Sequence, residues 1–350
     1  MNNTASNSVT MKMVQDIVGD LSEPKQSIYF ADLFASAVVG WAMFIVAISS
    51  SSLGLAIVSL LVGSFFLFRG LAFIHELVHQ HRMKLFRYFW HALIGVPLLV
   101  PLLLYLPTHM GHHSKDTYGT KKDGEYDQLR GRFWPVSIKL FFLGFALPIA
   151  LIVRFGLLTP LSALLPIVRT KVIPEFVHMS LRFPFTAEEP RQSWKKEFYF
   201  VEFLCMLVAW LLLSGLWTGN WKPVAAWYAT LVMIGSLNMA RALWTTHLYV
   251  EQEVGRSAGD QLTDSMNVTG GGLITLLMCP TGLRYHALHH VAAYLPYHAL
   301  GQAHQRLIQR LPPGSSYHSA GVANLFVGYQ RVLTMTAKST PRHFESEPMR

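Results

Sequence analysis

Charged side chains are scarce in this 350-residue sequence: Asp, Glu, Lys and Arg make up 14% of it, against roughly 25% of an ordinary soluble domain. Apolar residues make up 51%, and the mean hydropathy is +0.31. This shortage of charge excludes a disordered chain, a nucleic-acid-binding module and most soluble enzymes. It leaves a membrane protein that is large enough for one helical bundle and a substantial aqueous portion.

Other common features are also missing. Only two cysteines are present, and we expect Cys205 within a membrane span and Cys279 in a cytoplasmic segment, which argues against a disulfide between them. Residues 1–27 are polar and lack the basic start and apolar core of a signal peptide. The sequence contains neither the glycine-rich fingerprint that binds flavin or NAD nor a His-Pro-Gly-Gly segment of the cytochrome b5 kind.

Long apolar runs predict the membrane spans. A helix rises about 1.5 Å per residue and the hydrocarbon layer is about 30 Å thick, so ~20 residues cross it once. No charged residue occurs between Leu33 and Phe68, and polar residues around Ser49–Ser52 divide this run into two helices. A second pair of apolar runs is divided around Thr218–Lys222. We therefore expect an all-α membrane protein with about four transmembrane helices in two hairpins, at residues 31–48, 53–74, 203–221 and 223–244.

Two further apolar segments fit a crossing less well. Residues 92–106 include one glycine and two prolines and are too short for a comfortable span, so we expect a re-entrant or interfacial segment. Residues 141–167 include three prolines and Arg154. That composition favours an interfacial pair of helices or a bent hairpin.

The distribution of basic residues predicts the orientation. Of the 29 Lys and Arg residues, only Lys222 falls in the two turns expected on the outer side, so the bulk of the positive charge faces the cytoplasm. Both termini are expected on that side of what we take to be a bacterial inner membrane. The formal charge of +9 then reflects sidedness and contact with anionic membrane lipid, and no nucleic-acid partner is expected.

Histidine is frequent for a membrane protein, with 16 residues, and it is clustered at the predicted cytoplasmic boundary. The clusters are His75-Glu-Leu-Val-His79-Gln-His81, His109-Met-Gly-His112-His113 and His286-Ala-Leu-His289-His290, and His247 follows the last span on the same side. Residues three or four apart share a helix face. In each His-x-x-His-His box we expect the first two histidines to project together and the third to point about 100° away, so that a box can serve two metals or bracket one. Neutral imidazole suits Zn, Cu, Fe or Ni.

These boxes resemble those of the integral-membrane fatty acid desaturase and hydroxylase superfamily, over roughly residues 30–310, and the stretch from Gly282 to Leu300 is similar to bacterial desaturase-like proteins. The resemblance implies a membrane di-iron oxidase domain at 28–310 whose cytoplasmic helical cap holds the centre, flanked by cytoplasmic segments at 1–27 and 311–350. The implied ligands of two non-haem irons are His75, His79, His109, His112, His113, His247, His286, His289 and His290. One branch of the superfamily has Asn one helical turn before the ninth of these, where this sequence has Leu243.

The resemblance also implies groups around the irons. Carboxylates that hold imidazole N–H groups are expected, and the candidates are Glu76, Asp123 and Asp264, together with His81 beside the first box. Arg241, near the cytoplasmic end of the last span, is either a snorkelling side chain or a contact for a substrate carboxylate. No catalytic side chain is expected beyond the metal ligands.

The implied reaction is the O2-dependent oxidation of a fatty acid or fatty acyl chain at an unactivated C–H bond, which a di-iron centre can attack and an ionisable side chain cannot. Desaturation ranks first. The alternatives are oxidative decarboxylation of a free fatty acid to a terminal alkene and hydroxylation of a fatty acid or alkane. A separate ferredoxin-, rubredoxin- or cytochrome-type electron donor is implied, and a basic cytoplasmic surface suits an acidic one.

Two hypotheses lie outside this superfamily. The segment from His75 to His79 satisfies the H-E-x-x-H pattern of a membrane zinc metalloprotease, with Glu76 as general base, but this leaves two boxes unexplained. A metal transporter needs ligands near the bilayer midplane, whereas these histidines cluster at one boundary. Metal analysis separates the di-iron oxidase from the zinc metalloprotease, because the oxidase requires about two irons per chain and the protease one zinc.

Overall fold

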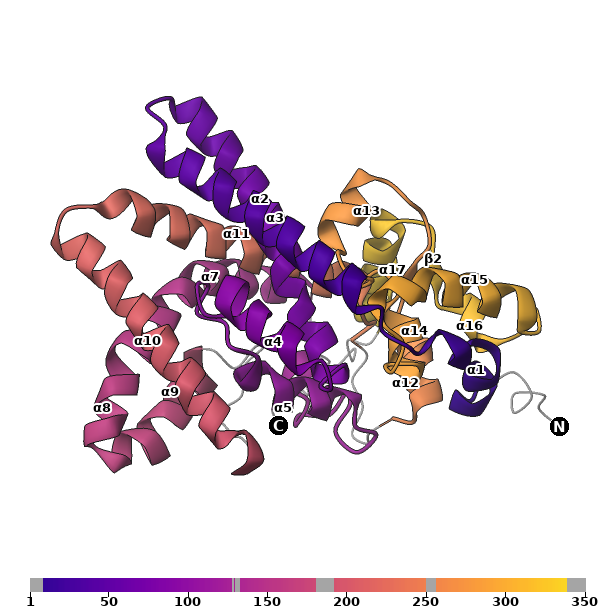
Figure 1. Cartoon of the computed structure of the whole chain (residues 1–350). Helices are drawn as coiled ribbons and strands as arrows, with labels where there is room; N and C mark the ends of the chain where they lie inside the picture. The colour runs from indigo at the N-terminus through magenta and orange to yellow at the C-terminus, as the bar shows by residue number, and fades with distance from the viewer. Residues whose placement is uncertain (1–8, 128, 130–132, 181–191, 250–255, 339–350) are drawn as a thin grey trace, which may run out of the picture.

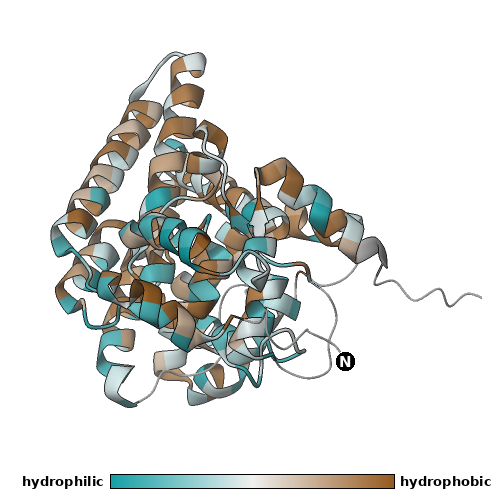
Figure 2. Ribbon diagram, turned by 90° about the vertical axis from the view of Figure 1, so that its right-hand side faces the viewer, coloured by the Kyte–Doolittle hydropathy of each residue, from teal (hydrophilic) through white to brown (hydrophobic). Residues whose placement is uncertain are grey.

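The computed structural model describes residues 9–127, 129, 133–180, 192–249 and 256–338, and almost all of its regular structure is helical (Figure 1). Long apolar helices form a bundle, and shorter helices form a cap at one end of it. Figure 2 shows brown, apolar residues along the protruding helical hairpin, while many teal, hydrophilic residues face the viewer on the cap side. The prediction of an all-α membrane protein is confirmed.

The first hairpin consists of α2 (Gln26–Ser49) and α3 (Leu53–His79), as predicted. The turn ends at Ser52, whose side chain accepts a hydrogen bond from the backbone N–H of Leu55 and so caps α3. The two helices pack closely because glycines meet at their interface: a Cβ atom at Gly63 would lie 3.0 Å from the carbonyl oxygen of Gly40.

The second hairpin consists of α10 (Lys195–Trp217) and α11 (Trp221–Thr245), again as predicted. Its turn contains Gly219, whose φ of 79° is readily adopted only by glycine. Large apolar side chains on the outer face of this hairpin remain exposed, such as Leu211 at 71%. A face of this kind suits lipid rather than water.

The segment between the hairpins differs from the prediction for residues 141–167. Helix α7 (Phe133–Ile152) continues through the π-helical η4 (Val153–Leu158) into α8 (Thr159–Leu164), and residues 134–164 are long and apolar enough to cross a membrane. Neither a bent hairpin nor an interfacial pair lies within 141–167. The chain turns at Leu165 instead and returns through η5 (Val168–Val172) and α9 (Ile173–Ser180), which contacts α7.

The prolines and the arginine in this segment explain the difference. Pro148 lies inside α7 without ending it, and Pro160 stands in the first turn of α8, where its missing N–H costs little. Arg154 is buried rather than interfacial, because it forms an ion pair with Glu202 of α10 at 2.6 Å. Arg169 binds the same carboxylate at 2.8 Å. Five helices of the described residues are therefore long and apolar enough to span, by length and composition.

The segment at 92–106 is folded into the bundle and is not one of these five helices. It begins in the π-helical η3 (His91–Gly95), which follows α4 (Lys84–Trp90), and ends in α5 (Leu102–His113). The turn between η3 and α5 is buried, and its Pro97 carbonyl accepts a hydrogen bond from the indole of Trp227 at 2.9 Å. This arrangement brings α5, and with it the second histidine box, beside α3.

The cap is built from the two ends of the chain. Strands β1 and β2 pair in parallel, with Asn267 opposite Gly321 and Val268 opposite Val322. Residues 311–338, assigned to a tail from sequence, are thus part of the fold, and α17 packs on α11. Cys205 and Cys279 are both buried and free. The remaining bounds are α1 Met11–Val18, η2 Gly19–Leu21, α6 Gly124–Asp127, η6 Gln192–Trp194, α12 Ala258–Asp264, β1 Asn267–Val268, α13 Leu273–Met278, α14 His286–Val291, η7 Tyr297–Ala299, α15 Leu300–Arg310, α16 Ser316–Ser319, β2 Gly321–Val322 and α17 Leu325–Lys338.

Candidate metal centre

All nine histidines predicted as ligands lie together where the cap meets the bundle. They form two adjacent groups, and in each group one nitrogen per ring lies within 4.8 Å of the corresponding nitrogen of every other ring. The five-histidine group contains His75, His79, His109, His113 and His289, and the four-histidine group contains His112, His247, His286 and His290. Two neighbouring donor sets of this size can hold a pair of metal ions.

Three helix ends and one loop deliver these side chains. His75 and His79 lie on the last turns of α3, the second box ends α5, and the third box forms most of α14. His247 lies just beyond α11. Both hairpins and the cap must therefore fold against one another before the two groups are complete.

Each His-x-x-His-His box is shared between the two groups, but not in the predicted way. His109 and His113 project together, whereas His112 joins the other group; likewise His286 and His290 project together and His289 does not. The expected pairing of the first two histidines of a box was wrong. Four residues advance a helix by a net rotation of about 40° and three by about −60°, so the first and third histidines are the better aligned pair.

The ring nitrogens of neighbouring histidines face one another at close range. His79 Nε2 lies 3.0 Å from His109 Nε2 in the first group, and His247 Nε2 lies 2.8 Å from His286 Nε2 in the second. The buried Nε2 atom of His75 has no hydrogen-bond partner among the described residues. Converging nitrogen lone pairs repel each other unless a cation lies between them, so the arrangement fits metal ions.

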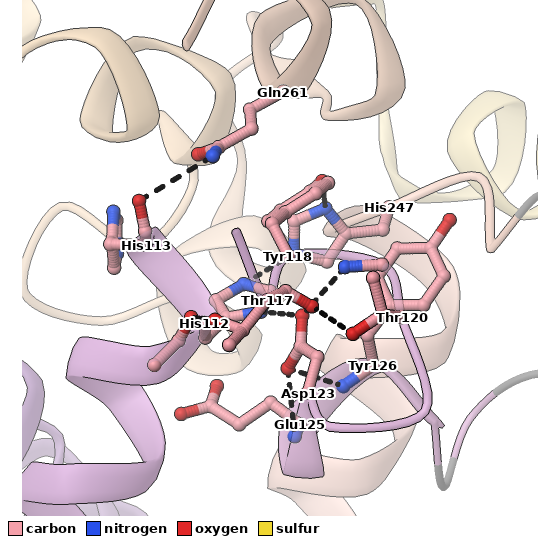
Figure 3. A network of polar contacts seen from close by, with 12 residues as sticks. His112, His113, Thr117, Tyr118, Thr120, Asp123, Glu125, Tyr126, His247 and Gln261 are labelled. Carbon is pink, nitrogen blue, oxygen red and sulfur yellow. Dashed lines mark hydrogen bonds and ion pairs between the residues drawn. The ribbon is translucent and has the colours of Figure 1, made fainter. Parts of the chain in front are cut away.

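Hydrogen bonds on the opposite side of the rings support this interpretation. Nδ1 of His109 lies 2.8 Å from Glu125 Oε1. Nδ1 of His112 lies 2.8 Å from Asp123 Oδ2 (Figure 3). An ionised carboxylate accepts hydrogen bonds and cannot donate them, so both contacts fit a ring proton on Nδ1. They leave the Nε2 lone pairs of both rings directed into the centre.

A second network orients His247. Tyr118 Oη lies 2.8 Å from His247 Nδ1 and donates a hydrogen bond to Asp264 Oδ2 at 2.8 Å. Arg256 forms an ion pair with the same carboxyl group at 2.8 Å. The ring of His290 is held by Gln261, whose Oε1 lies 3.0 Å from its Nδ1.

Burial keeps most of these rings neutral. It lowers the pKa well below the ordinary histidine value for six of them: His109, His113, His247, His286, His289 and His290. His112 is the exception. Burial disfavours its charge, but the neighbouring Asp123 carboxylate raises the pKa overall. Neutral imidazole is the form that binds a metal.

The predicted supporting residues lie in different places. Asp123 and Asp264 contact the histidine networks, as described above. Glu76 instead accepts hydrogen bonds from the hydroxyl of Tyr29 at 2.5 Å and from the backbone N–H of Tyr297 at 3.2 Å. His81 is exposed in the turn after α3 and belongs to neither group.

Sequence reasoning missed several groups that contact the histidines, among them Tyr105, Tyr118, Glu125 and Gln261. Two of them carried a weak signal. Tyr105 lies one helical turn before His109, and Glu125 follows Asp123 by two residues, in the loop that continues from the second box. The other two come from parts of the chain whose position depends on the whole fold.

A mainly apolar cavity leads to the centre. Its walls come from α3, α7 and α11, with Phe68, Leu147 and Ile234 among the lining residues. Four histidines reach it: His75, His112, His247 and His286. Arg241 and Asn238 also line it.

Comparison with known proteins identifies the family. The sequence model described as Fatty acid desaturase matches residues 50–321. The chain belongs to the fatty acid desaturase family. It is 36% identical over 331 residues to a ceramide hydroxylase from Caulobacter vibrioides, an alignment that covers 93% of each chain. No solved structure matches the chain significantly.

Family membership gives the histidine centre a chemical class. This desaturase-family protein is an integral membrane oxidoreductase of lipid metabolism, and its histidine groups can bind metal. Nothing in the centre favours a zinc metalloprotease. Glu76, the general base of that hypothesis, is hydrogen-bonded to Tyr29 on another helix, and the other two boxes join the same centre.

Proposed function

We propose that this protein is an O2-dependent di-iron hydroxylase that acts on the acyl chain of a membrane lipid of the ceramide type. The observation that carries the proposal is the apolar cavity between membrane helices that ends on histidines of both groups. Alignment with a ceramide hydroxylase over 93% of both chains supports hydroxylation as the outcome. We further propose that the centre and both termini face the cytoplasm of a bacterial inner membrane.

The donor set supports iron. The nine proposed ligands are imidazoles, which suit several transition metals, but zinc has no redox chemistry and cannot drive an oxidation. A bound iron pair would supply the reduction of O2 and the oxidation of an unactivated C–H bond. The five-histidine and four-histidine groups would hold one ion each.

The stoichiometry defines what else is needed. Hydroxylation converts R–H, O2, two electrons and two protons into R–OH and water, so one oxygen atom enters the lipid and the other leaves as water. Desaturation uses the same inputs but releases two waters and leaves a double bond. Both reactions therefore require an external electron donor, and they differ in the fate of the carbon that loses its first hydrogen.

Desaturation is the second candidate, favoured by the family description. Sequence reasoning placed it first and hydroxylation third, and similarity to a ceramide hydroxylase supports hydroxylation at least as well. Decarboxylation to an alkene requires a free carboxylate beside the metal, and a ceramide has none.

The chain's own residues would bind and orient the substrate. The apolar walls of the cavity fit a hydrocarbon chain. Arg241 binds Asn238 Oδ1 through Nη2 at 3.0 Å, while its buried Nη1 has no partner in the described part of the chain. An unpaired buried donor is costly, so we propose that Nη1 donates to a lipid oxygen, such as an amide carbonyl or a carboxylate, and fixes the chain relative to the irons.

Product analysis tests the function. The purified, iron-loaded protein in lipid nanodiscs would receive a ceramide, a free fatty acid or a phospholipid, with ¹⁸O2 and a reducing system. We expect ceramide to gain one ¹⁸O atom, seen by mass spectrometry. Loss of two hydrogens without oxygen uptake would favour desaturation, and a volatile alkene would favour decarboxylation. His112→Ala is the control, and oxidation that persists in this variant would contradict the assignment of the centre.

A further inference from the structure

The two histidine groups differ in what surrounds them. In the five-histidine group His79 and His113 are partly exposed, whereas the four-histidine group is entirely buried. The cavity reaches His75 and three members of the buried group, but neither His79 nor His113. The proposed substrate thus approaches from one side of the centre, and water from the other.

The order of residues along α3 shows the same separation between the substrate side and the water side of the centre. The cavity-lining residues Phe68, Leu71 and His75 precede His79 on the helix, towards the membrane. Helix α3 ends at His79, and His81 and Arg82, which follow shortly after it, are exposed. The second box repeats this pattern, because α5 ends at His113, whose ring centroid lies 4.7 Å from that of His79.

Exposed basic residues follow both helix ends. We call them the basic collar, and they are Arg82, Lys84, Lys115, Lys121 and Lys122. Arg82 comes three residues after His79, and Lys115 two residues after His113, so the collar adjoins the partly exposed histidines along the chain. Asp116 is the one exposed acidic residue in segments 80–84 and 114–122.

The collar is not used inside the fold. No collar residue forms an ion pair with another described residue. Elsewhere in the described chain, several arginines are paired with carboxylates, as Arg256 is with Asp264 and Arg154 with Glu202. Five unpaired cations beside one anion create a positive potential over the solvent side of the metal centre.

We propose that the basic collar is the docking surface for an acidic, one-electron carrier protein, and that electrons enter the centre through the five-histidine group. The inference rests on the proposed function, since each turnover consumes two electrons and the sequence has no flavin or NAD fingerprint. Two carriers must therefore bind in succession, each losing one electron. Complementary charge accelerates such brief encounters, and His79 and His113 offer the shortest exposed route to the metals.

An anionic membrane surface is the competing partner for basic residues. The geometry favours a soluble protein, because the collar follows His79 and His113, the two partly exposed histidines that the apolar cavity does not reach. The experiment below treats lipid binding as a separate outcome.

The test uses the full-length protein in nanodiscs and a reduced, acidic [2Fe–2S] ferredoxin as the probe. The triple variant Arg82→Glu/Lys115→Glu/Lys122→Glu reverses the charge of the collar. We expect the second-order rate of ferredoxin oxidation, followed anaerobically by stopped flow, to fall by about tenfold or more at low salt. The rate for the original protein should fall as salt is added, and that of the variant should respond much less.

Two controls distinguish weaker docking of ferredoxin from damage to the fold or to the metal centre. Lys12→Glu makes the same type of charge change on exposed α1, elsewhere on the cap, and should leave the ferredoxin rate within about twofold, as expected for a charge outside the contact. Dithionite should reduce the triple variant about as fast as the original protein. Binding of ferredoxin to the metal-free protein provides a readout independent of turnover, and it should weaken in the triple variant alone.

Two other results would overturn the inference, and a third would overturn only the proposed function. An unchanged ferredoxin rate and affinity in the triple variant would place the docking surface elsewhere. Loss of binding to phosphatidylglycerol vesicles with an unchanged ferredoxin rate would make the collar a lipid contact. If dithionite reduces the centre but no lipid is oxidised by any protein sample, the proposed function fails while the docking result still stands on its own.

Discussion

Asp123 shows how one side chain can fix a metal ligand. Its Oδ2 atom lies 2.8 Å from His112 Nδ1 and accepts the backbone N–H of Gly119 at 3.0 Å, while Oδ1 accepts the N–H groups of Glu125 and Tyr126. Burial alone would raise the pKa of Asp123, but His112 and these backbone donors lower it overall. The carboxylate therefore stays charged and rigid behind the ring.

We predict that Asp123→Asn weakens metal binding. The substitution keeps the shape of the side chain but removes the charge that supports His112, and loss of such a partner costs about 10–100-fold in metal affinity. Iron retained against a competing chelator, measured by mass spectrometry, would report the change. Asp116→Asn is the matched control, because Asp116 is exposed and belongs to neither histidine group; equal loss of iron in both variants would contradict the prediction.

We predict that Arg241→Met separates substrate binding from metal binding. Methionine keeps much of the apolar stem but removes the unpaired donor in the cavity, so kcat/KM should fall by about 10–100-fold, the range for a lost hydrogen bond from a charged group. Iron content should be unchanged. A variant that loses its iron, or one that keeps full kcat/KM, would assign Arg241 a structural role.

For individual site residues, the sequence was informative where one residue type recurs at a regular spacing. Eight of the nine histidines could be found because their spacings of three and four are regular, and His247 was assigned from the family resemblance and its place after the last predicted span. Glu125, Tyr118 and Gln261 have no such regularity. Each reaches its histidine only after a loop or the cap has folded over the centre, so composition and spacing could not distinguish them from ordinary surface residues.

Among the elements, the first hairpin depends most visibly on small residues. Gly63 of α3 faces the backbone of α2, and its added Cβ would also lie 3.2 Å from Met43 Cβ. Because α3 carries the first histidine box at its end, a shift of the hairpin is transmitted to His75 and His79.

We predict that Gly63→Leu destabilises the protein and Gly54→Ala does not. Leucine at position 63 would force the two helices apart, and overpacking of this kind costs about 1–3 kcal/mol. At Gly54 the nearest atom lies 4.0 Å from an added Cβ, so alanine has room. Thermal unfolding in detergent should show a lower midpoint for the first variant only; equal midpoints would mean that the hairpin can adjust without loss.

The elements also show where sequence reasoning fails. Uncharged runs broken by polar turns predicted both hairpins correctly, because the cost of burying charge in lipid is large and local. For residues 141–167, prolines and Arg154 suggested a break. The helix continues instead: a π-helical turn follows the segment that contains Pro148, and an ion pair with Glu202 compensates the buried charge of Arg154. Neither feature is visible in a linear sequence.

At the scale of the whole molecule, the centre joins the cap to the bundle. The box on α14 of the cap contributes to both groups, while the other ligands come from α3, α5 and the segment just beyond α11. Direct contacts at the same boundary include Tyr297 Oη, which donates to Asp32 at 2.6 Å. Bound metal should therefore act as a cross-link between two parts of the fold.

We predict that removing the metal loosens the cap before the bundle. A ligand at a hundredfold excess over its Kd stabilises the folded state by about 2.7 kcal/mol, and that contribution is lost on chelation. The midpoint of thermal unfolding should fall, and limited proteolysis should cut first within residues 256–338. Restored iron should reverse both effects. Early cleavage in the turns of the hairpins instead would show that the metal supports the bundle as a whole.

The order of the ligands along the chain has a consequence for biogenesis. His286, His289 and His290 follow every candidate span, so a ribosome must finish all the membrane helices before the last ligands exist. The centre cannot help insertion, and iron can enter only a protein that already sits in the bilayer. Cells short of iron should accumulate an inserted, inactive form that later iron can rescue without new synthesis.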